Sequence, residues 1–221
     1  MLIILLSFIS NCYSFCSSNL NDIEYGKLNI NITFTFIKSN KSLIITGYGE
    51  NIQNDIKNFT FSTNPLLKYS NCIEYIKFNG LISSISPLLF YKFINLKYVN
   101  LNKNLKIIHF GAFDSCYNLL YINLIDTNLS LIDENAFNHC RNLIRLDLPS
   151  SLIRINQNAF SGCFNLNYIS YYGYNNPSII SLKNKNRLIG NIFIGVNTSI
   201  VHVKSFYNDS YFNSLPIIKD L

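Results

Sequence analysis

The sequence predicts an α/β repeat fold, a solenoid of stacked units of about 23 residues with one short strand each and β-rich caps at both ends. The first observation that supports this fold is a regular spacing of one dipeptide along the chain. Asn-Leu dipeptides recur at 95–96, 118–119, 142–143 and 165–166, so that each begins one repeat period after the last. The second is chemical, because the residues after each dipeptide repeat the same apolar pattern.

Three apolar positions follow the leucine-rich spacing L-x-x-L-x-L, which sets one short strand per unit. They are Leu96, Val99 and Leu101, then Leu119, Ile122 and Leu124, then Leu143, Leu146 and Leu148. Each unit continues with an isoleucine, an Ala-Phe pair and a cysteine, at Ile108, Ala112, Phe113 and Cys116, at Ile132, Ala136, Phe137 and Cys140, and at Ile155, Ala159, Phe160 and Cys163. This pattern predicts a leucine-rich repeat solenoid coiled as a right-handed superhelix.

Degenerate units flank the three regular ones. Upstream, Cys72 replaces the first leucine, Ile76 and Phe78 continue the strand, and Phe90 and Phe93 take the phenylalanine and cysteine positions. Downstream, Leu166, Ile169 and Tyr171 begin a further strand before the pattern ends at Gly173. Since one unit cannot bury its apolar side alone, altered terminal units are expected to act as caps.

The predicted caps contain short strands of their own. Apolar residues alternate at Ile30, Ile32, Phe34 and Phe36, a turn follows at 39–41, and residues 43–45 resume the pattern, which predicts a β-hairpin. Beyond a loop at 175–177, residues 191–196 and 199–203 are predicted as two further strands.

The first ten residues form an uncharged apolar run, and small and polar residues follow it up to Ser18. We interpret this start as a signal peptide, with a buried N-terminal strand as the alternative. No transmembrane segment is expected beyond it. The predicted domain organisation is therefore a signal peptide at 1–17, an N-terminal hairpin cap at 18–70, repeats at 71–173 and a C-terminal cap at 174–221.

The distribution of basic residues and cysteines bears on which partners the protein can have and on the state of its thiols. The formal net charge is +6, but lysines and arginines are scattered singly rather than in runs, so we expect no nucleic-acid partner. Cys12 and Cys16 lie in or beside the predicted leader. The three cysteines of the regular repeats are expected to be buried thiols, and a Cys116–Cys140 bridge is possible but disfavoured by the repeat geometry.

The frame L-x-x-I-x-L-P-x-x-L-x-x-I-x-x-x-A-F-x-x-C, nearly complete from Leu143 to Cys163, resembles the BspA-type leucine-rich repeat of bacterial and protist surface proteins. Residues 42–49 resemble the hairpin before such arrays, and residues 201–218 resemble their closing segment. The resemblance implies an exported protein whose relatives are associated with adhesion to host or matrix surfaces. It implies no reaction and assigns no ligand residue. The sequence departs from the family pattern in two ways. The unit between Cys72 and Ile94 lacks the Ala-Phe-x-x-Cys signature, and only the unit that begins at Leu143 keeps the proline of the frame, as Pro149.

The strand residues between the buried ones should point outward, because strand side chains alternate. The first outward strand position is a tyrosine in four of the five units, and it is Arg145 in the remaining unit. These strand residues are expected to form a concave face that binds a protein or glycan ligand on another cell or matrix: Tyr75, Tyr98, Asn100, Tyr121, Asn123, Arg145, Asp147 and Tyr168. Exposed tyrosines suit recognition because they offer contact area at low entropy cost. The alternative is that this column of tyrosines only stabilises the sheet.

The sequence contains little evidence of motifs for catalysis, metal binding or cofactor binding. The three histidines, His109, His139 and His202, fall at unrelated offsets, and no common nucleophile, phosphate-loop or zinc motif occurs. His139 precedes Cys140, but the cysteine sits at a core offset, and the cysteines lie in a row rather than converging on one metal ion. We therefore expect no enzyme, no metal and no cofactor.

The function predicted from sequence is a non-enzymatic extracellular repeat protein, secreted or cell-surface associated, that mediates protein–protein contact or adhesion to cell surfaces and host matrix through its concave face. The alternative is a structural surface-coat subunit that self-associates. Six N-x-S/T sequons, at Asn31, Asn40, Asn58, Asn128, Asn197 and Asn208, are compatible with either, because asparagine richness alone explains about that number.

Overall fold

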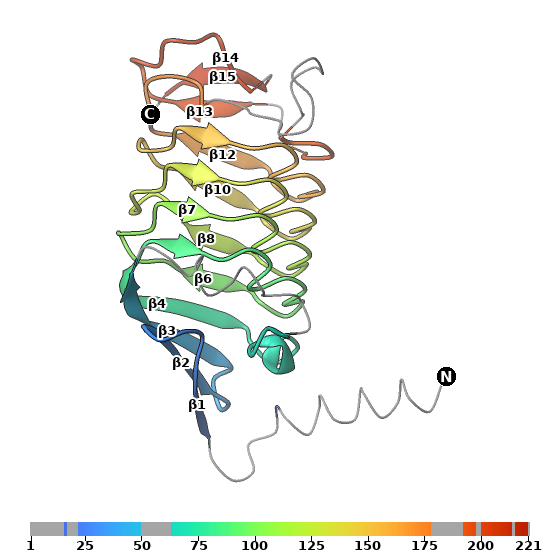
Figure 1. The fold of residues 1–221 in the computed structure, drawn as a ribbon. Coiled ribbons are helices and arrows are strands. Elements are labelled where there is room, and N and C mark those ends of the chain that lie inside the picture. The colour runs from blue at the N-terminus through green and yellow to red at the C-terminus, as the bar shows by residue number, and fades with distance from the viewer. Residues whose placement is uncertain are drawn as a thin grey trace.

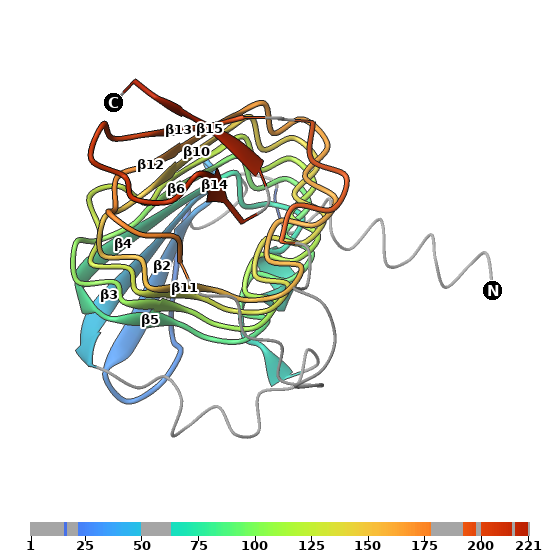
Figure 2. The same cartoon turned by 90° about the horizontal axis from the view of Figure 1, so that it is seen from above.

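The computed structural model describes residues 16, 22–49, 63–177, 192–197, 200–213 and 215–220. Successive turns of the chain stack on one another, with short parallel strands in register along the stack (Figure 1). Seen along the stack, the turns nearly superimpose (Figure 2). Each turn of the chain therefore adds one layer to a shared core.

The first sheet has the order β1-β2-β3-β4-β6-β8. Its strands are β1 (Ile23–Lys27), β2 (Ile32–Ile37), β3 (Ser42–Gly49), β4 (Tyr75–Ile82), β6 (Tyr98–Asn100) and β8 (Tyr121–Asn123). The strands β1, β2 and β3 pair antiparallel, and the pairs from β3 to β8 are parallel. The predicted hairpin is thus confirmed as β2 and β3, and it joins the repeats directly.

A second sheet on the other side of the turns has the order β11-β9-β7-β5. Its strands are very short: β5 (Ser84–Ile85), β7 (Ile107–Ile108), β9 (Leu131–Ile132) and β11 (Arg154–Ile155). The third sheet, β10-β12-β13-β15-β14, contains β10 (Arg145–Leu148), β12 (Tyr168–Tyr171), β13 (Val201–Val203), β14 (Tyr211–Phe212) and β15 (Leu215–Lys219). It lies next to the first sheet, since Ile144 N–H donates to the Leu120 carbonyl beside β8.

A column of phenylalanine rings runs through the core. Phe90, Phe113, Phe137 and Phe160 are fully buried and stack in sequence with ring centroids 5.2 Å apart, and Phe193 continues the stack 5.6 Å from Phe160. The predicted inward positions of the regular units are buried as well. Burying an aromatic side chain of this size makes one of the largest favourable contributions to stability that a residue can make.

Polar side chains also repeat in register. Asn142 donates to the Asn118 side chain and accepts from Asn165, which builds a ladder from the anchor asparagines that mark each unit. The thiols of Cys116, Cys140 and Cys163 are buried and unbridged, and each donates to a phenylalanine carbonyl of an earlier unit. The prediction of buried thiols in the regular repeats is confirmed.

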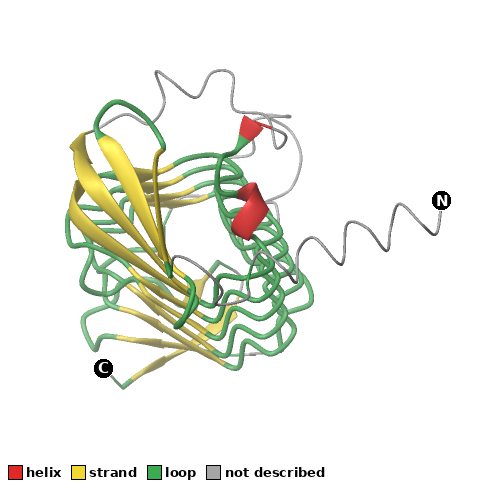
Figure 3. Ribbon diagram, turned by 90° about the horizontal axis from the view of Figure 1, so that it is seen from below, coloured by secondary structure: helices red, strands yellow, loops and turns green. Residues whose placement is uncertain are grey.

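The expected α/β character of each unit is wrong. Among the described residues, helical structure is limited to 3-10 turns such as η2 (Leu67–Tyr69), and strands and turns make up the rest (Figure 3). The cause lies in the turns, where each unit places a left-handed residue before the Ala-Phe position: Leu88, Gly111, Asn135 and Asn158, with φ of 56°, 57°, 56° and 57°. A right-handed helix cannot continue through such residues.

The strand predicted at 191–196 is also wrong, because residues 192–195 form turns. These residues take the place of the next Ala-Phe segment. Ile192 accepts from Phe160 N–H as Ala159 accepts from Phe137 N–H, and the Phe193 ring stacks on Phe160. The strand predicted at 199–203 is present as β13, which pairs parallel with β12.

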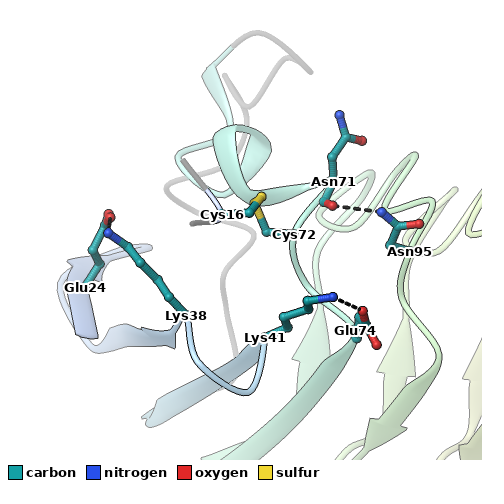
Figure 4. Close-up of a disulfide and its surroundings, with 8 residues drawn as sticks. All are labelled: Cys16, Glu24, Lys38, Lys41, Asn71, Cys72, Glu74 and Asn95. Atoms are coloured by element: carbon teal, nitrogen blue, oxygen red, sulfur yellow. Dashed lines mark hydrogen bonds and ion pairs between the residues drawn. A yellow bond between two sulfur atoms is a disulfide. The ribbon is translucent and has the colours of Figure 1, made fainter. Parts of the chain in front are cut away.

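Cys16 forms a disulfide with Cys72, which corrects the expectation that Cys16 belongs only to the leader region (Figure 4). Cys72 occupies the position that a leucine fills in the regular units, and it is buried. The bond therefore ties the chain ahead of β1 to the first unit of the array. The rest of the predicted leader, with Cys12, lies outside the described residues.

Candidate binding face

We call the exposed side of the first and third sheets the outer face. Along β4, β6 and β8 the predicted residues are in register, because Tyr75 pairs with Tyr98 and Tyr98 with Tyr121, while Lys77 pairs with Asn100 and Asn100 with Asn123. Arg145 pairs with Tyr168 and Asp147 with Ser170 in β10 and β12. The alternation that predicts this face is confirmed along β4, β6 and β8, where the residues between these positions are buried. In β10 and β12 it is incomplete, because Asp147 and Ser170 are buried as well.

The predicted site residues differ in how accessible they are. Tyr98, Asn100 and Arg145 are exposed, and Tyr75, Tyr121, Asn123 and Tyr168 are half-buried. Asn123 donates from its amide nitrogen to Asp126 at 2.9 Å, which fixes the orientation of its side chain. Asp147 is buried at 5% exposure, so its expected direct contact with a ligand does not fit its position.

Arg145 and Asp147 form a two-point ion pair on the outer face. The guanidinium donates from Nε and Nη2 to the two carboxylate oxygens at 2.6 and 2.9 Å, and Ser170 donates to the same carboxylate at 2.5 Å. A two-point pair of this kind holds an arginine in one orientation. Asp147 therefore positions Arg145, while Arg145 remains available at the surface.

Aromatic contacts extend this cluster. The Arg145 guanidinium lies 4.4 Å from the Tyr168 ring centroid, as the repeat register predicts, and Tyr168 stacks on His202 at 4.6 Å. His202 Nδ1 lies 2.7 Å from Asp220. Burial, with Asp147 nearby, raises the pKa of Tyr121, and burial raises that of Tyr168, so both present neutral hydroxyls at physiological pH.

Several residues of the outer face were not predicted. Tyr25, Tyr48 and Leu81 are exposed on β1, β3 and β4, and the pairing of Tyr48 with Leu81 places them side by side. His202 joins through β13, which the repeat pattern does not reach. Strand alternation in residues 23–27 and 42–49 was the available signal for the tyrosines.

The one cysteine with an adjacent histidine does not have the chemistry of a nucleophile. Cys140 is fully buried, its thiol donates to the Phe113 carbonyl, and burial raises its pKa well above the ordinary value. A thiol held protonated in this way is unreactive. Within the described part of the chain, no group of three or more histidine, cysteine or acidic side chains could hold a metal ion, and no helix is long and apolar enough to cross a membrane.

Comparison with solved structures shows the fold. A leucine-rich repeat protein from Eubacterium ventriosum matches with a TM-score of 0.52 and 15% identity, covering 84% of this chain and 55% of that one. The Treponema pallidum leucine-rich repeat protein gives a TM-score of 0.45 at 20% identity, covering 82% and 83%. This chain thus spans about half the length of the Eubacterium protein. The comparison with curated proteins finds no match.

A family model for the BspA-type leucine-rich repeat region matches six copies across residues 66–184. This span covers more than half of the chain and includes all the units recognised from the Asn-Leu dipeptides. It also includes the degenerate unit that begins near Cys72. The chain belongs to the BspA-type leucine-rich repeat family.

Proposed function

We propose that this protein is a non-enzymatic extracellular interaction module that binds a protein or glycan ligand on another cell or matrix through its outer face, the concave side of a right-handed solenoid with β-rich caps. The observation that carries the proposal is a set of outward residues in register in two adjacent sheets. Tyr75, Tyr98 and Tyr121 are in register in the first sheet, and Arg145 pairs with Tyr168 in the third. Tyrosine and arginine are the side chains that most often dominate binding energy in interfaces.

The packing beneath this face supports the proposal. The opposite side of each strand is buried in the core, and the Asp147 carboxylate and Tyr168 ring fix Arg145 from two directions. Side chains held in this way lose little conformational freedom when a ligand binds, and this raises affinity.

The disulfide supports an extracellular location. Disulfides such as Cys16–Cys72 persist in oxidising compartments and are rare in reducing ones. For the bond to remain in a processed chain, the proposed leader has to be cleaved before Cys16. We therefore propose cleavage upstream of Cys16, rather than at the predicted boundary at residue 17.

Replacing Tyr98, Tyr121 and Tyr168 together with serine is expected to reduce binding to matrix-protein and glycan arrays by at least about 100-fold, since two or more aromatic anchors of an interface typically contribute this much. A control variant with Tyr91, Tyr117 and Tyr174 replaced by serine removes three tyrosines that lie outside the strands of the outer face. It should bind like the unmodified protein. Equal binding by all three proteins, each with the same circular dichroism spectrum, would refute the proposal.

A further inference from the structure

Lysines that are scattered in the sequence gather on one half of the outer face. The register places Tyr25 of β1, Thr35 of β2, Ile44 of β3 and Lys77 of β4 in one row across the sheet. Lys27 lies in the next row, in line with Thr33, Thr46 and Asn79. Lys27 and Lys77 are both exposed, and neither forms an ion pair with another described residue.

The rim where these strands begin is also cationic. Lys41 and Lys97, which precede β3 and β6, both bind the single carboxylate of Glu74, at 2.5 and 2.6 Å. Figure 4 shows the pair of Lys41 and Glu74. The two lysine hydrogen bonds lower the pKa of Glu74, so the carboxylate stays charged, and one positive charge of the trio remains uncompensated. The side chains of Lys41 and Lys97 are 50% and 44% exposed.

Among the described residues, acidic side chains do not balance the positive charge of this half of the face. Within residues 22–49 and 63–100 the carboxylates are Asp22, Glu24 and Glu74, and each already has partners. Asp22 accepts from Ser39, and Glu24 accepts from Tyr69 and pairs with Lys38 and Lys68. The outward positions of the described strands β1, β2, β3, β4 and β6 therefore combine lysine, tyrosine, threonine and asparagine with apolar side chains such as Ile44 and Leu81, and none of them is a carboxylate.

We propose that the outer face over β1, β2, β3, β4 and β6 binds a linear acidic polysaccharide, a glycan chain that carries carboxylate or sulfate groups. This deepens the proposed binding function and rests on it. Lys27 and Lys77 lie three strands apart, about 15 Å at the spacing of neighbouring strands, so an extended polyanion that crosses the strands reaches both.

The neutral side chains match a sugar better than the alternatives. Exposed tyrosine rings at Tyr25, Tyr48 and Tyr98 offer negative π faces to the weakly positive C–H groups of sugar rings. Hydroxyl and amide groups, such as those of Thr46 and Asn79, can donate to and accept from sugar hydroxyls. A nucleic-acid site would require a denser array of basic residues than these separated lysines provide.

The test measures binding of the full chain to a fluorescent heparin oligosaccharide, a hyaluronan oligosaccharide and neutral dextran. The unmodified protein is expected to bind at least one of the two acidic glycans and not dextran. Lys27→Gln/Lys77→Gln should weaken that binding about tenfold, because two exposed ion pairs are lost. It should also make the affinity less dependent on salt concentration.

A control variant, Lys92→Gln/Lys106→Gln, removes the same charge from exposed positions outside the first sheet and should bind within about twofold of the unmodified protein. An equal loss in both variants, or equally tight binding of poly-glutamate and single-stranded DNA, would show non-specific attraction of polyanions and overturn the inference. Absence of binding to both acidic glycans would overturn it too. The proposed function survives that result if the Tyr98, Tyr121 and Tyr168 variant still loses its array ligand.

Discussion

Replacing Phe137 with alanine is expected to lower the free energy of unfolding by about 3–5 kcal/mol. The ring is fully buried and lies between Phe113 and Phe160, 5.2 Å from each, with interplanar angles of 5° and 2°. Removing it opens a cavity between two units that share one core, and neighbouring units cannot close it without breaking their own register. Urea denaturation followed by circular dichroism measures the change.

Phe110→Ala is the matched control, because the Phe110 side chain is 41% exposed and lies outside the stack of rings. Its loss should cost less than about 1 kcal/mol. Similar losses for the two variants would mean that the phenylalanine column does not hold the array together.

Replacing Cys16 with serine is expected to lower the free energy of unfolding by about 4 kcal/mol, the chain-entropy value for closing a loop of this size. The bond joins residues 56 positions apart and so restricts the unfolded chain strongly. It also holds Cys16, which lies ahead of β1, against the buried Cys72 side chain in the first unit of the array.

A reducing agent provides the control for this prediction. Reduction should lower the urea midpoint of the unmodified protein to that of the Cys16→Ser variant, and it should leave the variant unchanged. The three thiols Cys116, Cys140 and Cys163 are already reduced, so they do not contribute to the difference. A midpoint of the unmodified protein that does not respond to reduction would contradict the role given to the bond.

The sequence could predict the parts of the fold that repeat. Residues such as Leu119, Ile122 and Phe137 recur at fixed offsets, and each offset corresponds to one position in a layer of the core. The contact between Arg145 and Tyr168 was predictable for the same reason, since equal offsets in adjacent units lie side by side in a parallel ladder.

The parts of the fold that the sequence did not predict depend on contacts between residues that are not separated by one repeat length. Residues 191–196 alternate like a strand, but their true counterpart is the segment from Asn158 to Cys163, which shares asparagine, phenylalanine and glycine at the same spacing. The repeat period does not reveal this correspondence, because Phe160 and Phe193 are separated by more than one period. Cys16 likewise lies outside any repeat, so spacing could not indicate its pairing with Cys72.

Charge on the outer face was underestimated for a related reason. Lys27 and Lys41 are far from Lys77 and Lys97 in the sequence, and they lie in or beside the same sheet because β1–β3 extend the repeat sheet. The burial of Asp147 was similarly hidden, because it depends on Arg145 and Ser170 both turning toward it. The strand alone decides which way a side chain points, whereas the exposure of that side chain also depends on its neighbours.

Hydrogen–deuterium exchange in the presence and absence of a ligand from the arrays tests the central claim most directly. Binding through the outer face predicts slower exchange in peptides that contain β3, β4, β6, β8, β10 and β12, while the turns around Asp114, Asn138 and Ser161 exchange as in the free protein. Protection of those turns, with β4, β6 and β8 unchanged, would contradict binding through the outer face.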